Sequence, residues 1–160
     1  MPYLTAVCNE VLRLYPTVPV TARIAKKTSV IAGQTIPEGT PAIMSMWQNN
    51  RDKALWGEDA LSFNPGRWLT GPNAAHGGAR APNALLTFLH GPRSCIGQTF
   101  AQIEMKVLLA VLVKRFRFEL AMPQEDVDIG GFITIKPMKG MWLRLIDLQN
   151  GEKVKAASSA

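Results

Sequence analysis

The apolar residues at the start of the chain recur at intervals of three and four, as on one face of a helix: Leu4, Val7, Cys8, Val11 and Leu12. Pro2 suits the first position of a helix, because its missing N–H would have no partner there. Tyr15 precedes Pro16, and that proline disfavours helical backbone at the residue before it. The pattern therefore predicts a helix over residues 2–14.

A second periodic stretch runs from about Gly97 to Lys114 and predicts the longest helix of the chain. Its apolar residues form one stripe with neighbours beside it: Phe100, Ile103, Val107 and Val111, then Ala101, Met105, Leu108 and Leu112. Gln98, Gln102 and Lys106 lie on the other side. We expect the isolated chain to expose apolar helix surface and to be prone to aggregation.

Shorter patterns predict small strands. Prolines and β-branched residues keep residues 16–23 extended, and strands follow at 29–32 and 40–46, separated by turns at Gly33 and at 37–39. Strands are also predicted at 117–120, 132–136 and 141–146. Residues 64–83 predict a long irregular loop, and residues 149–160 a disordered tail. The fold class is mainly α with small β-sheets, α+β.

Composition narrows the classes of function. With 160 residues, 47% of them hydrophobic and 19% charged, the chain is typical of one folded domain. A net charge of +6 is compatible with nucleic-acid binding, but the basic residues are scattered and no nucleic-acid motif is present. We therefore expect no nucleic-acid partner. The longest apolar run, 107–113, is too short to cross a bilayer, and no signal peptide is recognisable.

Cys95 lies in the most informative segment, residues 88–97. Gly91 permits backbone conformations closed to other residues, and Gly97 leaves room for a flat macrocycle. Arg93 offers a forked cation to a carboxylate such as a haem propionate, and Phe88 and Ile96 supply an apolar wall. At the start of a helix the dipole favours the thiolate, the form that binds metal. These features suit a thiolate ligand to haem iron.

Other interpretations of Cys95 remain open from the residues alone. A single cysteine is most often a buried, unreactive side chain. A cysteine hydrolase would need a base, for which His76 and His90 are the candidates. A bridge to Cys8 would consume the proposed ligand, and two cysteines make neither a disulfide framework nor a zinc site.

Glu10 and Arg13 share one face of the first predicted helix. Such pairs usually lie in solvent, but this helix is apolar, and burial would require a further partner. The apolar-flanked turn Phe63-Asn-Pro-Gly-Arg67-Trp68 supplies one in Arg67.

Three segments together resemble hallmarks of the cytochrome P450 family, in the family's order: Glu10-x-x-Arg13, Phe63-x-Pro-x-Arg67 and Phe88-x-x-Gly-x-Arg-x-Cys95-x-Gly. The resemblance implies haem (iron protoporphyrin IX), with Cys95 as the axial iron ligand and as the catalytic residue. It places Arg93 and Arg23 at the propionates, and gives Glu10, Arg13 and Arg67 the role of a structural triad. Gly66 and Trp68 depart from the usual residues beside the triad arginine.

The resemblance covers residues 1–148, as the C-terminal part of a haem domain similar to eukaryotic microsomal members. It implies a monooxygenase that acts on a small lipophilic substrate with dioxygen. Segments 18–22 and 131–133 would border the substrate. An NADPH-dependent reductase would dock near Lys106, Lys114 and Arg115. The parent enzyme would lie on the cytosolic face of the endoplasmic reticulum.

Because the family's oxygen-activating helix has no counterpart, we expect a truncated chain that is inactive alone. It also shows no anchor or signal peptide. A non-catalytic haem-binding remnant and a haem-free basic interaction domain are the alternatives.

Overall fold

The computed structural model describes residues 1–150. Helix α1 (Pro2–Leu14) has the predicted bounds, and it ends where the Tyr15 amide donates to the Val11 carbonyl at 2.7 Å. The buried side chains of α1 include two charged ones: Ala6, Cys8, Glu10, Arg13 and Leu14. Buried charges in a helix require partners from elsewhere in the fold.

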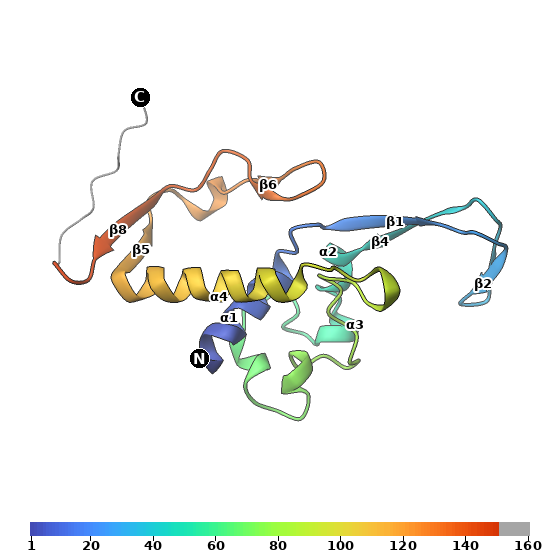
Figure 1. Ribbon diagram of the computed structural model, residues 1–160, viewed down its shortest axis with the longest axis horizontal. Helices are drawn as coiled ribbons and strands as arrows, with labels where there is room; N and C mark the ends of the chain where they lie inside the picture. Colours follow the sequence, from blue (N-terminus) through green and yellow to red (C-terminus); the bar gives the residue numbers. More distant parts are fainter. Residues whose placement is uncertain (151–160) are drawn as a thin grey trace.

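Two antiparallel ribbons follow α1 (Figure 1). Strand β1 (Val20–Ile24) pairs with β4 (Pro41–Ser45), from Val20 opposite Ser45 to Ile24 opposite Pro41. Between them, β2 (Ser29–Ile31) pairs with β3 (Gln34–Ile36). Ala32 and Gly33 have φ of 48° and 80°, as a two-residue hairpin turn requires. The strands predicted at 29–32 and 40–46 are confirmed, whereas β3 was not predicted.

Two single-turn helices connect β4 to the long loop: α2 (Met46–Asn49) and α3 (Lys53–Trp56). The side chains of Ser45 and Asp52 cap them by accepting the amides of Gln48 and Ala54 at 3.1 and 2.8 Å. The loop predicted at 64–83 contains the 3₁₀ turns η1 (Pro65–Trp68) and η2 (Ala74–His76) and is otherwise irregular. A small core of Trp56, Ala60, Ala79 and Ala84 holds it.

The second half begins with the turn η3 (Gly91–Arg93) and helix α4 (Gln98–Arg115), which confirms the predicted long helix. Strand β5 (Phe116–Leu120) then pairs antiparallel with β8 (Leu143–Asp147). Between them lie the turn η4 (Gln124–Asp126) and the short hairpin of β6 (Ile129–Gly130) and β7 (Lys136–Pro137).

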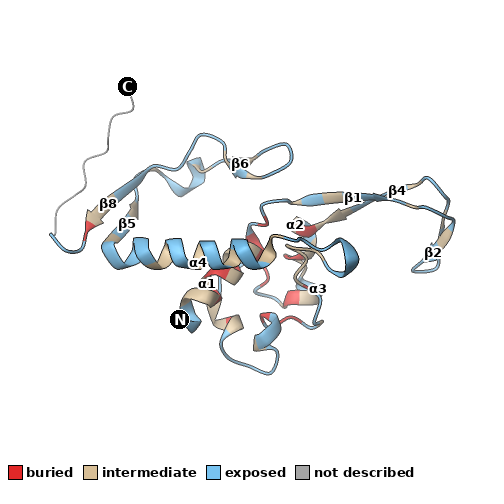
Figure 2. Cartoon of the chain, in the orientation of Figure 1, coloured by how far each residue is buried: buried red, intermediate tan, exposed pale blue. Residues whose placement is uncertain are grey.

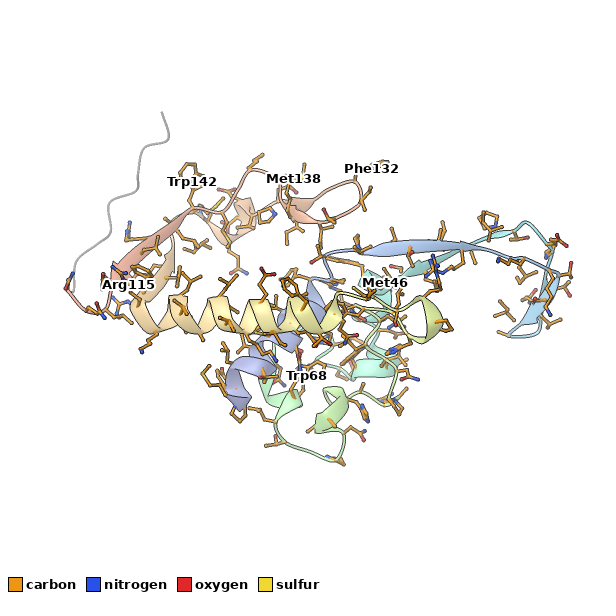
Figure 3. All side chains as sticks on the ribbon, viewed as in Figure 1. Met46, Trp68, Arg115, Phe132, Met138 and Trp142 are labelled. Carbon is orange, nitrogen blue, oxygen red and sulfur yellow. The ribbon has the colours of Figure 1, made fainter. Side chains whose placement is uncertain are left out.

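The strand predicted at 132–136 is wrong. Gly131, with φ of 149°, turns the chain, so that residues 131–135 form the tip of the β6–β7 hairpin. Phe132 at this tip is 99% exposed and points away from the body of the chain (Figure 3). The predicted tail is also not disordered from its start, because the Gln149 amide donates to Asp147 Oδ1 at 2.8 Å within a turn. Residues 151–160 of that tail lie outside the described residues.

Helix α4 crosses the middle of the structure, and buried residues gather around α1, α2 and α3 (Figure 2). Its apolar stripe is exposed, as expected: Phe100, Ile103, Val107 and Val111. Gln102 and Lys106, from the polar side of the pattern, are instead half-buried. In residues 1–150, no helix has the length and apolar character needed to cross a membrane.

Candidate functional site

Glu10 is fully buried in α1, and its carboxylate accepts five hydrogen bonds. Arg13 donates two of them, from Nε to Oε2 at 3.0 Å and from Nη2 to Oε1 at 2.8 Å. Arg67 Nε donates to Oε1 at 3.1 Å, and so does the Asn64 amide at 2.9 Å. The indole N–H of Trp68 donates to Oε2 at 2.9 Å. The predicted contact among Glu10, Arg13 and Arg67 is therefore present.

Arg13 uses its remaining N–H groups to hold the chain that follows β4. Its Nη1 donates to the carbonyls of Asn50 and Ala60 at 2.7 and 2.6 Å, and its Nη2 donates to the Ser62 carbonyl at 3.1 Å. The guanidinium also lies 5.0 Å from the ring centre of Trp56, within cation–π range. One buried cation thus fixes residues 50–62 against α1.

Asp59 adds a second carboxylate that sequence reasoning did not identify. Arg67 Nη2 donates to Asp59 Oδ2 at 2.8 Å and to the Asp59 carbonyl at 3.2 Å. The side-chain hydrogen bond from Asn64, together with the charge and hydrogen bond of Arg67, outweighs burial, which raises the pKa of Asp59, and holds this pKa below its usual value. Two arginines and two carboxylates make this cluster neutral, which reduces the cost of burying it.

The pKa of Glu10 reflects two opposing effects. Burial raises it, but the hydrogen bonds from Arg13, from the Asn64 amide and from Trp68 outweigh burial, so the net pKa lies below the usual value for a glutamate. Glu10 therefore stays ionised and fully hydrogen-bonded at neutral pH. Such a carboxylate is suited to holding structure and not to exchanging protons.

Cys95 lies in the loop of residues 88–97, three positions before the start of α4. This loop leads directly into α4 (Figure 1). The Cys95 amide donates to the Phe88 carbonyl at 2.8 Å, which closes the loop. Leu89 and Gly91 both have positive φ, 58° and 79°, where the chain reverses. A Cβ on Gly97 would lie 3.9 Å from the Cys95 sulfur, so a larger side chain there would cover it. The loop presents the thiol as an exposed group.

A cavity of about 400 Å³ opens beside Cys95. Apolar side chains form most of its wall: Leu12, Val18, Met46, Phe88, Leu89 and Ala101. Arg93 is its one cation. An exposed sulfur, an apolar wall and a guanidinium fit the sulfur ligation, flat apolar body and carboxylates of haem. In residues 1–150 no three His, Cys, Asp or Glu side chains gather as a metal site.

Arg23, Ile96 and the 131–133 segment, which the sequence placed at the haem or the substrate, do not line the cavity beside Cys95. Arg23 lies on β1, two residues from the cavity-lining Thr21, and its Nη1 lies 3.3 Å from Thr21 Oγ1. Ile96 is fully exposed and does not line the cavity. The 131–133 tip does not line it either, although the Ile135 amide donates to the Thr17 carbonyl at 2.8 Å, next to Val18.

The alternative interpretations of Cys95 find no support. The thiol is exposed, so it is not a buried core residue. Both cysteines are free, and burial raises the pKa of the Cys8 thiol inside α1. His90 Nε2 lies 3.0 Å from the Leu85 carbonyl, and within residues 1–150 neither His90 nor His76 forms a hydrogen bond with Cys95. The hydrolase arrangement is therefore absent from the part of the chain described.

Comparisons with known proteins show which family this chain resembles. The family model described as Cytochrome P450 matches residues 1–144. The chain is 48% identical over 141 residues to Cytochrome P450 monooxygenase sphH of Aspergillus fumigatus, covering 88% of this chain and 26% of the relative. It is 42% identical over 154 residues to Cytochrome P450 monooxygenase abl5 of Leptosphaeria maculans, covering 91% of this chain and 28% of the relative.

Among solved structures, the retinoic acid-bound cyanobacterial CYP120A1 superposes with a TM-score of 0.82 at 30% identity. The match covers 92% of this chain and 33% of that one. The chain thus spans between about a quarter and a third of the length of the proteins it matches. From the match over residues 1–144 and the shared fold, the chain belongs to the cytochrome P450 family.

Proposed function

We propose that this chain is the thiolate-bearing part of a haem-thiolate monooxygenase that inserts one atom of dioxygen into a small lipophilic substrate. Haem is the cofactor of this family. The observation that carries the proposal is the exposed Cys95 sulfur beside a cavity with an apolar wall and one guanidinium. Cys95 would be the axial ligand of the haem iron and the catalytic residue.

Each residue near Cys95 has a distinct part in this proposal. Arg93, which lines the cavity, and Arg23, which is exposed on β1 two residues from cavity-lining Thr21, would hold the haem propionates as cations. Gly91 allows the turn, Gly97 leaves the sulfur uncovered, and Phe88 would give the ring an apolar surface within the cavity. Ile96, exposed outside the cavity lining, would contact the ring from beyond this wall. When bound, haem supplies the redox-active iron that activates dioxygen, and thiolate ligation favours O–O cleavage.

The triad does no proton transfer in this proposal. Glu10, Arg13 and Arg67 are buried and joined in one hydrogen-bonded network, so they would fix the long loop and α1 relative to the Cys95 loop. The substrate would lie near 18–22 and the 131–133 tip, where the surfaces are small or apolar. Both features suit a lipophilic molecule.

We further propose an NADPH-dependent reductase as electron donor. Lys114 and Arg115 are exposed at the C-terminal end of α4, whereas Lys106 is half-buried, so the docking patch would centre on the first two. Charge reversal at Lys114 should make the reduction rate less dependent on salt. Unchanged salt dependence would count against this patch. From the resemblance to eukaryotic microsomal members, we also propose the cytosolic face of the endoplasmic reticulum for the parent enzyme.

We expect residues 1–160 alone to turn over no substrate, because the chain matches only 26% of the length of Cytochrome P450 monooxygenase sphH. Haem binding without turnover by the whole protein would support the non-catalytic remnant instead. Absence of haem binding would support the basic interaction domain.

The absorption spectrum of the reduced, carbon-monoxide-bound protein tests the proposal. We expect a strongly red-shifted Soret band that Cys95→Ser abolishes. The matched control is Cys8→Ser, which makes the same chemical change at the buried cysteine of α1 and should retain the red shift. A red-shifted band that survives in Cys95→Ser would overturn the proposal.

A further inference from the structure

Asn50 is a fully buried amide that connects the Glu10 network to the Cys95 loop. Its Nδ2 donates to the Arg13 carbonyl at 3.1 Å and to Thr87 Oγ1 at 2.9 Å. Its Oδ1 accepts the Leu86 amide at 3.0 Å. Its own carbonyl accepts Arg13 Nη1 at 2.7 Å. Both side-chain N–H groups and the side-chain oxygen of Asn50 are thus engaged.

The contacts run without a break from the triad toward the sulfur. Arg13 binds the Glu10 carboxylate and both receives from and donates to Asn50. Asn50 holds residues 86 and 87, and the next residue, Phe88, accepts the Cys95 amide at 2.8 Å. The sequence gap between Asn50 and Thr87 makes this a tertiary link and not a local turn.

Two neighbouring contacts strengthen the attachment of the same segment. Thr87 Oγ1 donates to the Leu12 carbonyl on α1 at 2.7 Å, while it accepts from Asn50. Asn49 Nδ2 donates to the Ala84 carbonyl at 2.6 Å. Residues 84–87 are therefore held by α1 and by the end of α2 together, directly before the loop begins.

We propose that Asn50 is a positioning residue for Cys95, which transmits the fixed geometry of the Glu10–Arg13–Arg67 network to the cysteine loop. The proposal rests on the proposed function for the role of the sulfur. Only an amide of this length offers two donors and one acceptor at these positions. An aspartate would have the same shape, but it would set carboxylate oxygens against the Arg13 carbonyl and remove both donors.

The test compares Asn50→Asp with Asn73→Asp, which makes the same change at an exposed asparagine without a capping hydrogen bond. The first measurement is amide hydrogen exchange at Leu86 and Cys95 in the purified protein without added haem. We expect exchange at both amides to accelerate on the order of tenfold in Asn50→Asp, as for the loss of about one hydrogen bond. Asn73→Asp should match the wild type.

The second measurement is the share of the carbon-monoxide complex that keeps the red-shifted Soret band. Asn50→Asp should lower this share. Leu14→Ala, which opens a cavity at the buried end of α1, should lower thermal stability and leave the share unchanged. If Asn50 has only a structural role, Asn50→Asp should likewise lower thermal stability and leave the fraction of the complex with the red-shifted band unchanged.

Thr87→Val removes the hydroxyl that accepts the hydrogen bond from Asn50. This variant tests the proposal if Asn50→Asp does not fold. Thr87→Val should lower the share and Thr87→Ser should restore it. Wild-type exchange rates and an unchanged share in these variants would overturn the proposal. Failure of the proposed function has a different signature, because the red-shifted band would then persist in Cys95→Ser. The exchange rates at Leu86 and Cys95 would still test the role of Asn50.

Discussion

The indole N–H of Trp68 and the Glu10 carboxylate are joined by a hydrogen bond of 2.9 Å between elements 58 residues apart. Trp68 stands at the end of η1, below α4 and close to α1 (Figure 3). The residue that the sequence presents as a departure from the usual pattern thus adds a donor to the buried carboxylate. It also packs against Trp56, with ring centres 6.2 Å apart.

Replacing Trp68 by phenylalanine keeps an aromatic ring and removes this donor. We expect Trp68→Phe to lower the free energy of unfolding by about 2–3 kcal/mol, because a hydrogen bond to a buried carboxylate is lost. Urea titration of the purified protein measures the change. Trp142→Phe is the control, since Trp142 is 69% exposed and its replacement should have little effect. Equal stability of the two variants would contradict the role of the indole.

Gly77 and Gly78 form a natural pair for a second prediction. Both have positive φ, 67° and 72°, so alanine strains the backbone at either position by about 1–2 kcal/mol. At Gly77, however, the added Cβ would lie 2.6 Å from Cζ2 of Trp68, whereas at Gly78 the nearest atom is Arg67 Cβ at 3.6 Å.

We therefore expect Gly77→Ala to be less stable than Gly78→Ala by a further ~1–3 kcal/mol, because the Trp68 ring must shift. Thermal or urea unfolding measures the difference, and tryptophan fluorescence should change only in Gly77→Ala. Two variants of the same stability would show that the ring moves without cost.

The ionisation of Glu10 predicts a pH dependence. Its pKa in the folded protein lies below the unfolded value of about 4.3, because the hydrogen bonds from Arg13, Asn64 and Trp68 outweigh burial. Its stabilisation is therefore complete above about pH 5 and is lost as pH falls through the lower, folded pKa.

Glu10→Gln should be about 3–5 kcal/mol less stable than the wild type at neutral pH, since it leaves two buried guanidinium groups without their shared partner. This difference should shrink as pH falls below about 4. Urea titrations across the pH range measure it. Glu38→Gln, at an exposed glutamate, should follow the wild type at every pH. A gap that stays constant into acid would contradict the ionised state of Glu10.

Sequence patterns predicted the two long helices and four of the short strands, but they missed other short elements. The repeats in 2–14 and 97–114 extend over several turns, so their periodicity is unambiguous, and α1 and α4 match them. Helices α2 and α3 contain four residues each, too few for any period, and they depend on caps from Ser45 and Asp52. The apolar run at 132–136 resembled a strand, but its residues turn at an exposed hairpin tip.

In the candidate site, too, some residues could be recognised from the sequence and others could not. Glu10, Arg13 and Arg67 carry charge within apolar surroundings, and this contrast is visible in the sequence. Asn50 and Thr87 carry no charge, belong to no spaced pattern and become important only when the fold brings residues 37 apart within 2.9 Å. Asp59 lies among other surface-type residues of the loop, so nothing in the sequence distinguishes it before Arg67 is placed beside it.

The exposed stripe on α4 predicts self-association of the isolated 160-residue chain. Phe100, Ile103, Val107 and Val111 are 72%, 53%, 56% and 63% exposed, and a continuous apolar surface of this kind is unusual on a monomer. Light scattering against protein concentration should show oligomers without haem. The double substitution Val107→Glu and Val111→Glu should reduce them, because charges on the stripe oppose its burial between copies.

The control for this prediction is Val30→Glu, which adds a charge at a valine that is 70% exposed on β2, away from the stripe. Val30→Glu should form oligomers to the same extent as the wild type, because a charge placed away from the stripe should not reduce self-association. A monomeric wild type with a sharp, reversible melting transition in the absence of haem would show that the stripe is tolerated in water. The apolar stripe on α4 would then not need to be buried against another protein surface for the chain to stay monomeric.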